Sequence, residues 1–481
     1  MEKPLVDILQ KLSQRKESPF YAPGHKKGFG INKSLIELLG EKVFSADLPE
    51  LPELDNLFAP YSVIQKAQEL AAQTFGAQET WFLVNGSTCG IIAAILATCK
   101  AGEKIILPRN CHQSAISGMI LSGAVPIFVE PDYDAWWDLA YSITPQTLSN
   151  TLEKHPDIKA VLVTYPSYQG VTGDLKEIAR LTHTKGIPLI VDEAHGAHFC
   201  FHSRLPDSAL SLGADLVIQS THKVLGSLTQ SSMLHLQGQR VDRQKIFNSL
   251  QLLQSTSPSY LLLASLDAAR AQMDKEGKFL LERTLNLAQI ARSTLSKLDK
   301  ISVLEKPSNS VSFKDLDLTR LTIKVTDLGL SGFSVDKWLR EEENVTAELP
   351  SLSNLTFMIT IGNSLEDIQA LCQSFKKLVN QRKNVLPFDL PQQLPDFINE
   401  SPLLSPREAF FLPTEIVKRK SCLNRISAEL ICPYPPGIPI IIPGQKITQS
   451  ELDYLTAILQ QGGIVTGCQD SNLNTFKVIA N

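Results

Sequence analysis

Six short apolar segments alternate with helix-like stretches between residues 60 and 240, and this alternation constrains the fold more than any other feature of the sequence. The segments lack the regular polar alternation of strands with one face in water, so we expect strands buried on both faces. They span residues 81–84, 104–107, 125–129, 160–165, 188–191 and 215–219. Buried strands that alternate with helices are typical of a mostly parallel sheet with helices on both faces. We therefore predict an α/β fold.

The chain is also too long for one hydrophobic core, because its 481 residues exceed the size that a single core usually serves. Apolar residues with helical spacing near the start predict an amphipathic helix in an N-terminal arm. Prolines and few aliphatic runs predict a linker before the last segment. The expected parts are an N-terminal arm (1–55), a large domain (56–300), a small α+β domain (301–385), a proline-rich linker (386–406) and a C-terminal domain (407–481).

Local patterns predict the elements of the small domain. Residues 278–298 predict a helix that leads into it, and the alternation of residues 321–326 predicts a strand with one face in water. Ser334 is expected to cap the N-terminus of the next helix, and residues 355–361 to form another strand. A capping box at residues 364–367 predicts the start of a further helix.

Composition excludes several classes of protein. Lys and Arg number 46 against 50 Asp and Glu, a net charge of −4, so the chain lacks the basic excess of nucleic-acid-binding proteins. No apolar stretch approaches the roughly 20 residues of a spanning helix, and the charged start does not resemble a secretory signal. The eight cysteines include no Cys-x-x-Cys pair, which favours reduced thiols. We expect a cytoplasmic protein with neither nucleic acid nor membrane as a partner.

The segment Asn85-Gly-Ser-Thr-Cys-Gly90 follows the first predicted strand and precedes an apolar helix. Small residues with hydroxyl groups at a helix N-terminus place backbone N–H groups where they can bind an anion. The sequence lacks both the nucleotide-binding Gly-x-x-x-x-Gly-Lys-Ser/Thr pattern and the Gly-x-Gly-x-x-Gly pattern. The segment is therefore either a phosphate cradle or a glycine turn before a packed helix.

Two further segments follow predicted strands, and each brings a charged group to the carboxyl edge of the sheet. Asp192-Glu-Ala-His195 follows residues 188–191, and Ser220-Thr-His-Lys223 follows residues 215–219. Open α/β sheets bind ligands at this edge, and a lysine there can form a Schiff base. Taken singly, Asp192 could instead cap a helix and Lys223 could be a surface lysine.

Three histidines after Asp192 have helical spacing, so His195, His198 and His202 could form a metal-binding face. Aromatic and cysteine neighbours favour packing, and we expect no metal. Taken together, a phosphate cradle, a strand-end carboxylate and a strand-end lysine are the three groups that pyridoxal 5'-phosphate (PLP) requires. The combination is far more specific than any of its parts, and it predicts a PLP-binding large domain.

The same residues resemble the Orn/Lys/Arg decarboxylase family of PLP-dependent enzymes with the aspartate aminotransferase fold (fold type I), in its short form and most like the bacterial arginine decarboxylases. The resemblance runs through nearly the whole chain. It is carried by Tyr21-Ala-Pro-Gly-His-Lys26, Asp47-Leu-Pro-Glu-Leu-Pro-Glu-Leu-Asp55, Asn85-Gly-Ser-Thr-Cys-Gly90, Pro108-Arg-Asn-Cys-His112, Asp192-Glu-Ala-His-Gly-Ala-His198, Ser220-Thr-His-Lys223, Leu228-Thr-Gln230, Thr256-Ser-Pro-Ser-Tyr260 and Pro433-Tyr-Pro-Pro-Gly-Ile-Pro439.

This resemblance implies roles for individual residues. Lys223 is expected to hold PLP as a Schiff base, Asp192 to pair with the pyridinium nitrogen, and Lys223 or His222 to return a proton to the α-carbon. The remaining cofactor contacts concern the ring, its phenolic oxygen and the phosphate. They are expected from His112 stacked on the ring, His195 at the phenolic oxygen, Ser87, Thr88, Ser220 and His222 at the phosphate, and Thr229 at a phosphate across a dimer interface.

The implied reaction is decarboxylation of a basic L-amino acid, with arginine first, then lysine and ornithine, as a step of polyamine biosynthesis. A homodimer or higher homo-oligomer is also implied, with the arm and the C-terminal segment as contact surfaces. Gln445 stands where the family commonly has Glu, which leaves the substrate open. Acidic candidates for the distal cation of the substrate are Asp47, Glu50, Glu53, Asp55 and Glu429. The alternatives are an aminotransferase, a carbon–oxygen or carbon–sulfur lyase, and a catalytically idle regulatory relative.

Overall fold

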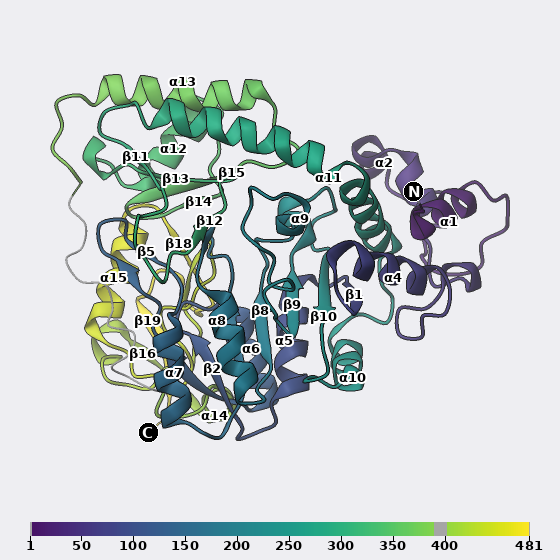
Figure 1. The fold of residues 1–481 in the computed structure, drawn as a ribbon, viewed down its shortest axis with the longest axis horizontal. Helices are drawn as coiled ribbons and strands as arrows, with labels where there is room; N and C mark the ends of the chain where they lie inside the picture. Colours follow the sequence, from purple (N-terminus) through teal and green to yellow (C-terminus); the bar gives the residue numbers. More distant parts are fainter. Residues whose placement is uncertain (1, 389–401, 481) are drawn as a thin grey trace.

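A seven-stranded sheet forms the centre of the molecule (Figure 1). The computed structural model describes residues 2–388 and 402–480. Across the sheet the strands follow the order β1 (Glu79–Leu83), β10 (Ser232–Leu236), β9 (Leu216–Gln219), β8 (Leu189–Asp192), β6 (Ile158–Thr164), β2 (Lys104–Pro108) and β3 (Val125–Val129).

The six strands predicted from the sequence all belong to this sheet and run in one direction. The seventh, β10, was not predicted; it lies between β1 and β9 and is antiparallel to both. Because these six strands share one direction, their carboxyl ends meet at one edge of the sheet. The predicted α/β class with a mostly parallel sheet is confirmed.

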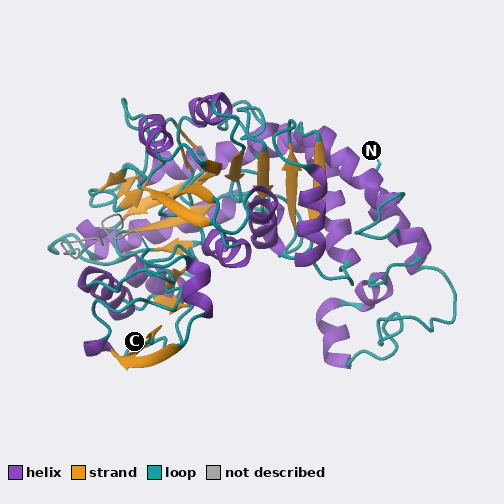
Figure 2. Cartoon of the chain, turned by 90° about the horizontal axis from the view of Figure 1, so that it is seen from below, coloured by secondary structure: helices purple, strands orange, loops and turns teal. Residues whose placement is uncertain are grey.

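Helices cover both faces of the sheet (Figure 2). Residues of α5, α6 and α10 share one buried cluster with alternate strand residues such as Leu83 and Ile218. Residues of α4, α7, α8 and α11 share the other cluster with Phe82 and Val217. The helices are α4 (Val63–Phe75), α5 (Gly86–Thr98), α6 (Gln113–Ser122), α7 (Pro145–Lys154), α8 (Leu175–Thr184), α9 (Thr221–Val224), α10 (Arg243–Leu253) and α11 (Tyr260–Leu295).

The N-terminal segment lies at one end of the molecule, beside α4 and α11 (Figure 1). Its helices are α1 (Pro4–Ser13), α2 (Lys33–Leu39) and α3 (Glu41–Ala46). The predicted amphipathic helix is α1, whose Leu5, Leu9 and Leu12 are buried against the large cluster. Its start is fixed from α11, because Asp267 Oδ2 accepts a hydrogen bond of 3.0 Å from the Leu5 backbone N–H.

A smaller antiparallel sheet with the order β11-β13-β15-β14 follows α11 and has its own core. It comprises β11 (Ser302–Val303), β13 (Arg320–Lys324), β15 (Asn354–Met358) and β14 (Leu349–Pro350), with helices α12 (Gly332–Glu342) and α13 (Leu365–Gln381). The predicted capping box at Ser364 and Asp367 is confirmed at the start of α13.

The helix expected at residues 278–298 is confirmed for residues 278–295, but its expected start and two other expectations for this region are wrong. The long helix α11 begins at Tyr260 rather than near residue 278, because its first turns are buried between α1, α4 and the sheet and so lack a solvent-facing pattern. Ser331, not Ser334, caps α12, and its hydroxyl accepts from the Ser334 N–H. The face of β13 predicted to be in water is buried, since Thr322 is fully buried and bonds Thr356.

The last described segment, residues 402–480, forms a small unit with its own buried cluster. It contains α14 (Pro406–Phe411), β16 (Thr414–Lys418), β17 (Cys432–Tyr434), α15 (Gln449–Gln460), β18 (Ile464–Thr466) and β19 (Thr475–Ile479). Most of the predicted linker, residues 389–401, lies outside the described residues. The domain boundaries therefore stay a prediction.

Two expectations from composition concern the cysteines, expected as reduced thiols, and membrane-spanning helices, of which none was expected. All eight cysteines are free thiols. Among the helices described within residues 2–388 and 402–480, none combines the length and apolarity that crossing a bilayer requires.

Candidate active site

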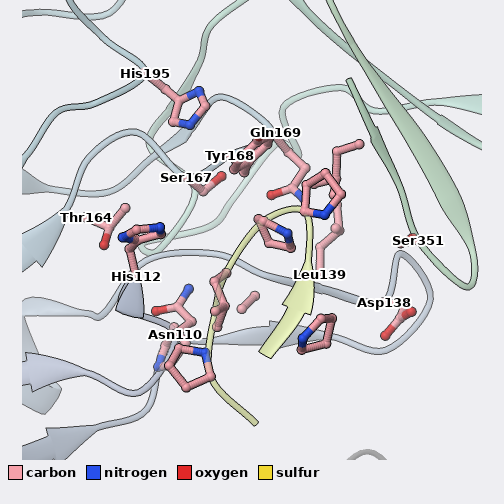
Figure 3. Close-up of a pocket in the computed structure, with 18 of the residues that line it drawn as sticks. Asn110, His112, Asp138, Leu139, Thr164, Ser167, Tyr168, Gln169, His195 and Ser351 are labelled. Carbon is pink, nitrogen blue, oxygen red and sulfur yellow. The ribbon is translucent and has the colours of Figure 1, made fainter. Parts of the chain in front are cut away.

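A pocket of about 410 Å³ opens at the carboxyl edge of the parallel strands (Figure 3). It brings together Ser87, His112, Asp192, His195 and Lys223, five residues that the sequence singled out. The proline-rich loop of residues 433–439 lines it from the C-terminal unit, and residues 349–352 line it from the small sheet. Three parts of the chain therefore meet around one cavity.

The predicted anion cradle lies at the start of α5, directly after β1. Asn85 occupies the N-cap but its side chain forms no capping hydrogen bond, so the first N–H groups of the helix are not capped by it. Ser220 Oγ donates to Ser87 Oγ at 2.7 Å, which joins the loop after β9 to this turn. Gly90 permits the close approach of helix and sheet, because a Cβ there would lie 2.7 Å from Leu83 Cδ1.

Asp192 and Lys223 reach the pocket from neighbouring strands. Asp192 is the last residue of β8, and Lys223 lies in the short helix α9 that follows β9. Burial lowers the pKa of Lys223, whereas the charge of Asp192 raises it and that of Arg320 lowers it. The lysine is thus a mostly buried amine beside a carboxylate rather than the surface lysine of the alternative interpretation.

His195 lies between Lys223 and a buried arginine. Its Nε2 is 3.0 Å from Lys223 Nζ, and its Nδ1 is 3.1 Å from Arg320 Nη2. Because a guanidinium can only donate, Nδ1 must accept and the proton of the neutral ring must be on Nε2. Burial lowers the pKa of His195 well below its ordinary value, with Lys223 and Arg320 as further causes, so the ring is neutral. His195 therefore donates to Lys223, which accepts as an uncharged amine.

Arg320 was not predicted as a site residue. It begins β13 on the face expected to be in water, and that mistaken expectation hid it. Its Nε lies 3.6 Å from Asp317 Oδ2, and His198 Nε2 lies 3.1 Å from the same oxygen. Burial raises the pKa of Asp317, but His198 and Arg320 outweigh burial and lower it to about 2. The strand offered no separate signal for Arg320, because Thr322 and Lys324 alternate with apolar residues in the same way.

His112 and His222 have fixed orientations. His112 caps α6, accepting from the Ser114 N–H at 3.2 Å, and a Cβ on Gly437 would lie 3.1 Å from its Nε2. His222 Nδ1 donates to the Ser231 carbonyl at 2.8 Å, which leaves Nε2 with a lone pair. Burial lowers the pKa of both histidines, so both are uncharged at neutral pH.

Some predicted residues lie elsewhere. Thr88 and Thr229 are exposed and do not line the pocket of this chain. Ser220 and His222 do not line it either, although Ser220 bonds the lining residue Ser87 and His222 precedes Lys223. Gln445 is buried away from the pocket, where its amide donates to Glu451 and its oxygen accepts from Arg109. The pocket also contains groups that sequence reasoning missed, namely Asn110, Glu130, Tyr133, Asp138, Thr164 and Tyr168.

The five acidic candidates for the substrate's cation do not line the pocket. Each carboxylate has a partner of its own. Asp47 bonds His25, Glu50 bonds Asn56, and Glu53 pairs with Arg15. Asp55 accepts from the backbone N–H groups of residues 56, 61, 62 and 64, and Glu429 from those of residues 469 and 477.

The three histidines considered as a metal face are separately paired. His195 contacts Lys223, His198 contacts Asp317, and His202 Nε2 lies 2.8 Å from Glu282. The backbone forms turns and a short 3₁₀ helix here (η2, Phe199–Phe201), so helical spacing does not align them. Within the described part of the chain no group of three metal-ligating side chains occurs.

Comparison with known proteins agrees with this architecture. Residues 3–367 match the family described as Orn/Lys/Arg decarboxylase, major domain, and residues 401–467 match its C-terminal domain. The arginine decarboxylase of Bacillus subtilis is 42% identical over 99% of this chain and 98% of its own length. That of Bacillus anthracis is 39% identical, over 99% of this chain and 97% of its own length.

Among solved structures, the lysine decarboxylase of Francisella novicida is similar with a TM-score of 0.84 and 23% identity, covering 99% of this chain and 81% of that one. This likeness concerns the fold, and it confirms the predicted fold type I architecture. The long sequence matches go further, and on them the chain belongs to the Orn/Lys/Arg decarboxylase family.

Proposed function

We propose that this protein is a PLP-dependent decarboxylase of a basic amino acid, with arginine as the first choice. The observation that carries the proposal is that Lys223, Asp192, His195, His112 and Ser87 line one pocket. These side chains supply an amine, a carboxylate, a ring donor, a stacking ring and an anion site.

The residues present fit the cofactor. The start of α5 has no side-chain cap and lies beside the hydroxyls of Ser87 and Ser220, which suits a phosphate. Thr164 lines the pocket, and its buried Oγ1 has no hydrogen-bond partner, so a polar atom at the pocket wall is unsatisfied. Lys223 is held uncharged by His195, as a nucleophile toward an aldehyde must be.

When bound, PLP supplies an electron sink for the electron pair that remains on the α-carbon as carbon dioxide leaves. The Asp192 carboxylate would pair with the ring nitrogen of the bound cofactor and favour its protonated form. His195 presents its Nε2–H to an acceptor at the position of Lys223 Nζ. Lys223 or His222 is the candidate to return a proton to the α-carbon, and the Nε2 of His222 would first have to take that proton up on its lone pair.

Relatives support arginine over the other substrates. The two Bacillus proteins at 42% and 39% identity are named arginine decarboxylases, whereas the lysine decarboxylase of Hafnia alvei is 26% identical. Lysine is the second choice and ornithine the third. Decarboxylation of arginine gives agmatine, which agrees with a step of polyamine biosynthesis.

The location of Gln445 supports an active enzyme. Its bonds to Arg109 and Glu451 make it part of the support behind the proline-rich loop, so the lost charge does not remove a carboxylate from the pocket. This weakens the alternative of a catalytically idle relative. An aminotransferase or a carbon–oxygen or carbon–sulfur lyase remains the alternative within the same fold.

The test is a product assay. Purified protein with added PLP is given arginine, lysine and ornithine separately, and carbon dioxide and the matching amine are measured beside a Lys223→Ala control. We expect arginine to give agmatine and carbon dioxide, with no turnover in the control. Absence of carbon dioxide from all three substrates, with PLP bound, would reject the decarboxylase and favour the aminotransferase, lyase or idle relative.

A further inference from the structure

The far side of the pocket has no assigned role. Figure 3 shows Asp138 across the cavity from His195 and His112. Asp138 lies between β4 (Tyr133–Asp134) and β5 (Leu139–Ala140), in a hairpin that follows β3. Its carboxylate lies in the same cavity as Lys223 but comes from a different part of the sheet edge.

Hydroxyl groups hold this carboxylate in place. Asp138 Oδ1 accepts from the Tyr133 hydroxyl at 2.5 Å, and Oδ2 accepts from the buried Ser353 hydroxyl at 3.1 Å. Tyr454 of the C-terminal unit also lines the pocket, and burial raises its pKa, with the charge of Asp138 as a further cause. The large domain, the small sheet and the C-terminal unit therefore converge on one acidic group.

Asp138 lacks a cationic partner. Across the described ranges, 2–388 and 402–480, no Lys, Arg or His nitrogen forms an ion pair with it within 4.0 Å. Lys324 acts on it only from a distance, because its Nζ donates to Thr326 at 2.7 Å and lies 5.2 Å from the centre of the Trp136 ring. Burial raises the pKa of Asp138, while Tyr133, Ser353 and Lys324 lower it. A cation that enters the pocket would offset the cost of keeping this carboxylate charged.

The other acidic side chains of the pocket have different surroundings. Asp192 acts on Lys223 and His112, at the opposite side. Glu130 acts on the buried Arg109 guanidinium, and its charge is among the causes that raise the pKa of Arg109 against burial. Asp138 is therefore the carboxylate best placed to meet a cation from outside the protein.

Apolar side chains lie around the path toward Asp138. Leu139, Leu349, Leu352 and Ile438 line the same cavity. Methylene groups of a straight side chain can pack against such a lining, while the charged end reaches the carboxylate.

We propose that Asp138 binds the distal cation of the substrate, the ammonium or guanidinium group of a basic amino acid, with Tyr133 and Ser353 fixing its orientation. This assignment rests on the proposed function, which puts the reacting end of the substrate at Lys223. Asp138 would thus determine substrate specificity, a role that none of the five acidic candidates from the sequence can have because none of them lines the pocket.

The test separates charge from the rest of the ligand. Agmatine carries a guanidinium tail, and pentylamine carries the same amine on an uncharged chain. Both are titrated calorimetrically into wild type, Asp138→Asn and Asp132→Asn, with and without added PLP. Asn suits the positive φ of +55° at position 138, so the variant preserves the backbone. Asp132 is the matched control, an exposed aspartate outside the pocket lining.

We expect wild type and Asp132→Asn to prefer agmatine over pentylamine, and Asp138→Asn to lose that preference by roughly 30-fold or more with its affinity for pentylamine unchanged. The proposal would be overturned if Asp138→Asn and wild type preferred agmatine over pentylamine equally. It would also be overturned if wild type did not prefer agmatine, cadaverine or putrescine over uncharged amines. If Asp138→Asn does not fold, Ser353→Ala takes its place, with a preference reduced about threefold as support and an unchanged one as refutation. The product assay on wild type tests the decarboxylase separately.

Discussion

At the residue scale, the protonation of Lys223 depends on an arginine that does not touch it. Arg320 donates to His195 Nδ1, which puts the ring proton on Nε2 and directs it at the lysine. Burial lowers the pKa of Lys223 most, and among the charged groups around it Asp192 and Glu348 raise the pKa while Arg320 lowers it. Arg320 is thus a positioning residue that, together with burial, favours the uncharged amine.

We predict that Arg320→Met raises the pKa of Lys223. In protein freed of cofactor, the rate at which an amine reagent modifies Lys223 should then rise at higher pH than in wild type, as measured by peptide mass spectrometry. Arg270→Met is the control, because Arg270 is an equally buried arginine paired with the aspartate three residues before it. The account fails if the two variants have the same pH profile as wild type.

Sequence reasoning found the residues at strand ends and missed those that pack behind them. Lys223, Asp192 and Ser87 follow strands, and topology alone brings strand ends together. Arg320 and Asp138 come from parts of the chain whose approach depends on how the small sheet and the β4–β5 hairpin dock. Local pattern carries no information about that docking, so their roles could be read only from the structure.

At the element scale, the site depends on how closely α5 packs on the sheet. Gly90 faces Leu83 and Ile218, and an added Cβ would lie 2.9 Å from Ile218 Cγ2. Any side chain there would push the helix N-terminus away from Ser220. The glycine thus serves the geometry of the anion cradle as well as the packing.

Gly90→Ala is therefore predicted to weaken PLP binding about tenfold and to destabilise the fold by about 1–3 kcal/mol. Gly362→Ala is the control, because its nearest neighbour lies at 3.7 Å, an ordinary contact. Cofactor titration by absorbance and urea unfolding measure the two effects. A Gly90→Ala protein that binds PLP as tightly as the control would contradict the role given to this glycine.

Most elements of the large domain could be predicted because buried strands and capped helices leave clear local patterns. The elements that were missed or wrongly predicted share one cause, which is that contacts with distant parts of the chain bury residues that would otherwise face solvent. β10 contains His235, and a polar residue argues against a buried strand when only the sequence is known. In the structure the ring is satisfied, because Thr80 and Gln219 form hydrogen bonds with it. The first turns of α11 are buried by neighbouring elements and so lack the amphipathic pattern of a surface helix. The face of β13 that was expected to be in water is buried as well.

At the scale of the whole molecule, one chain forms the pocket that contains Lys223 and Asp192. Two predicted cofactor contacts, Thr88 and Thr229, are exposed and lie outside this pocket. A homodimer would give Thr229 a role, since it would then reach the phosphate of the other subunit. Light scattering should accordingly give a mass of at least 2 × 53.1, or about 106 kDa. A mass of one chain at micromolar concentration would contradict the dimer and leave Thr229 without its proposed role.

The central claim is that Lys223 holds PLP in the pocket that also contains Asp192 and His195. The most direct measurement is borohydride reduction of the PLP-loaded protein, followed by proteolysis and mass spectrometry. The account predicts that the reduced cofactor is found on the peptide that contains Lys223, and that Lys223→Ala yields no modified peptide. Cofactor attached at another lysine, or unchanged labelling in Lys223→Ala, would contradict it.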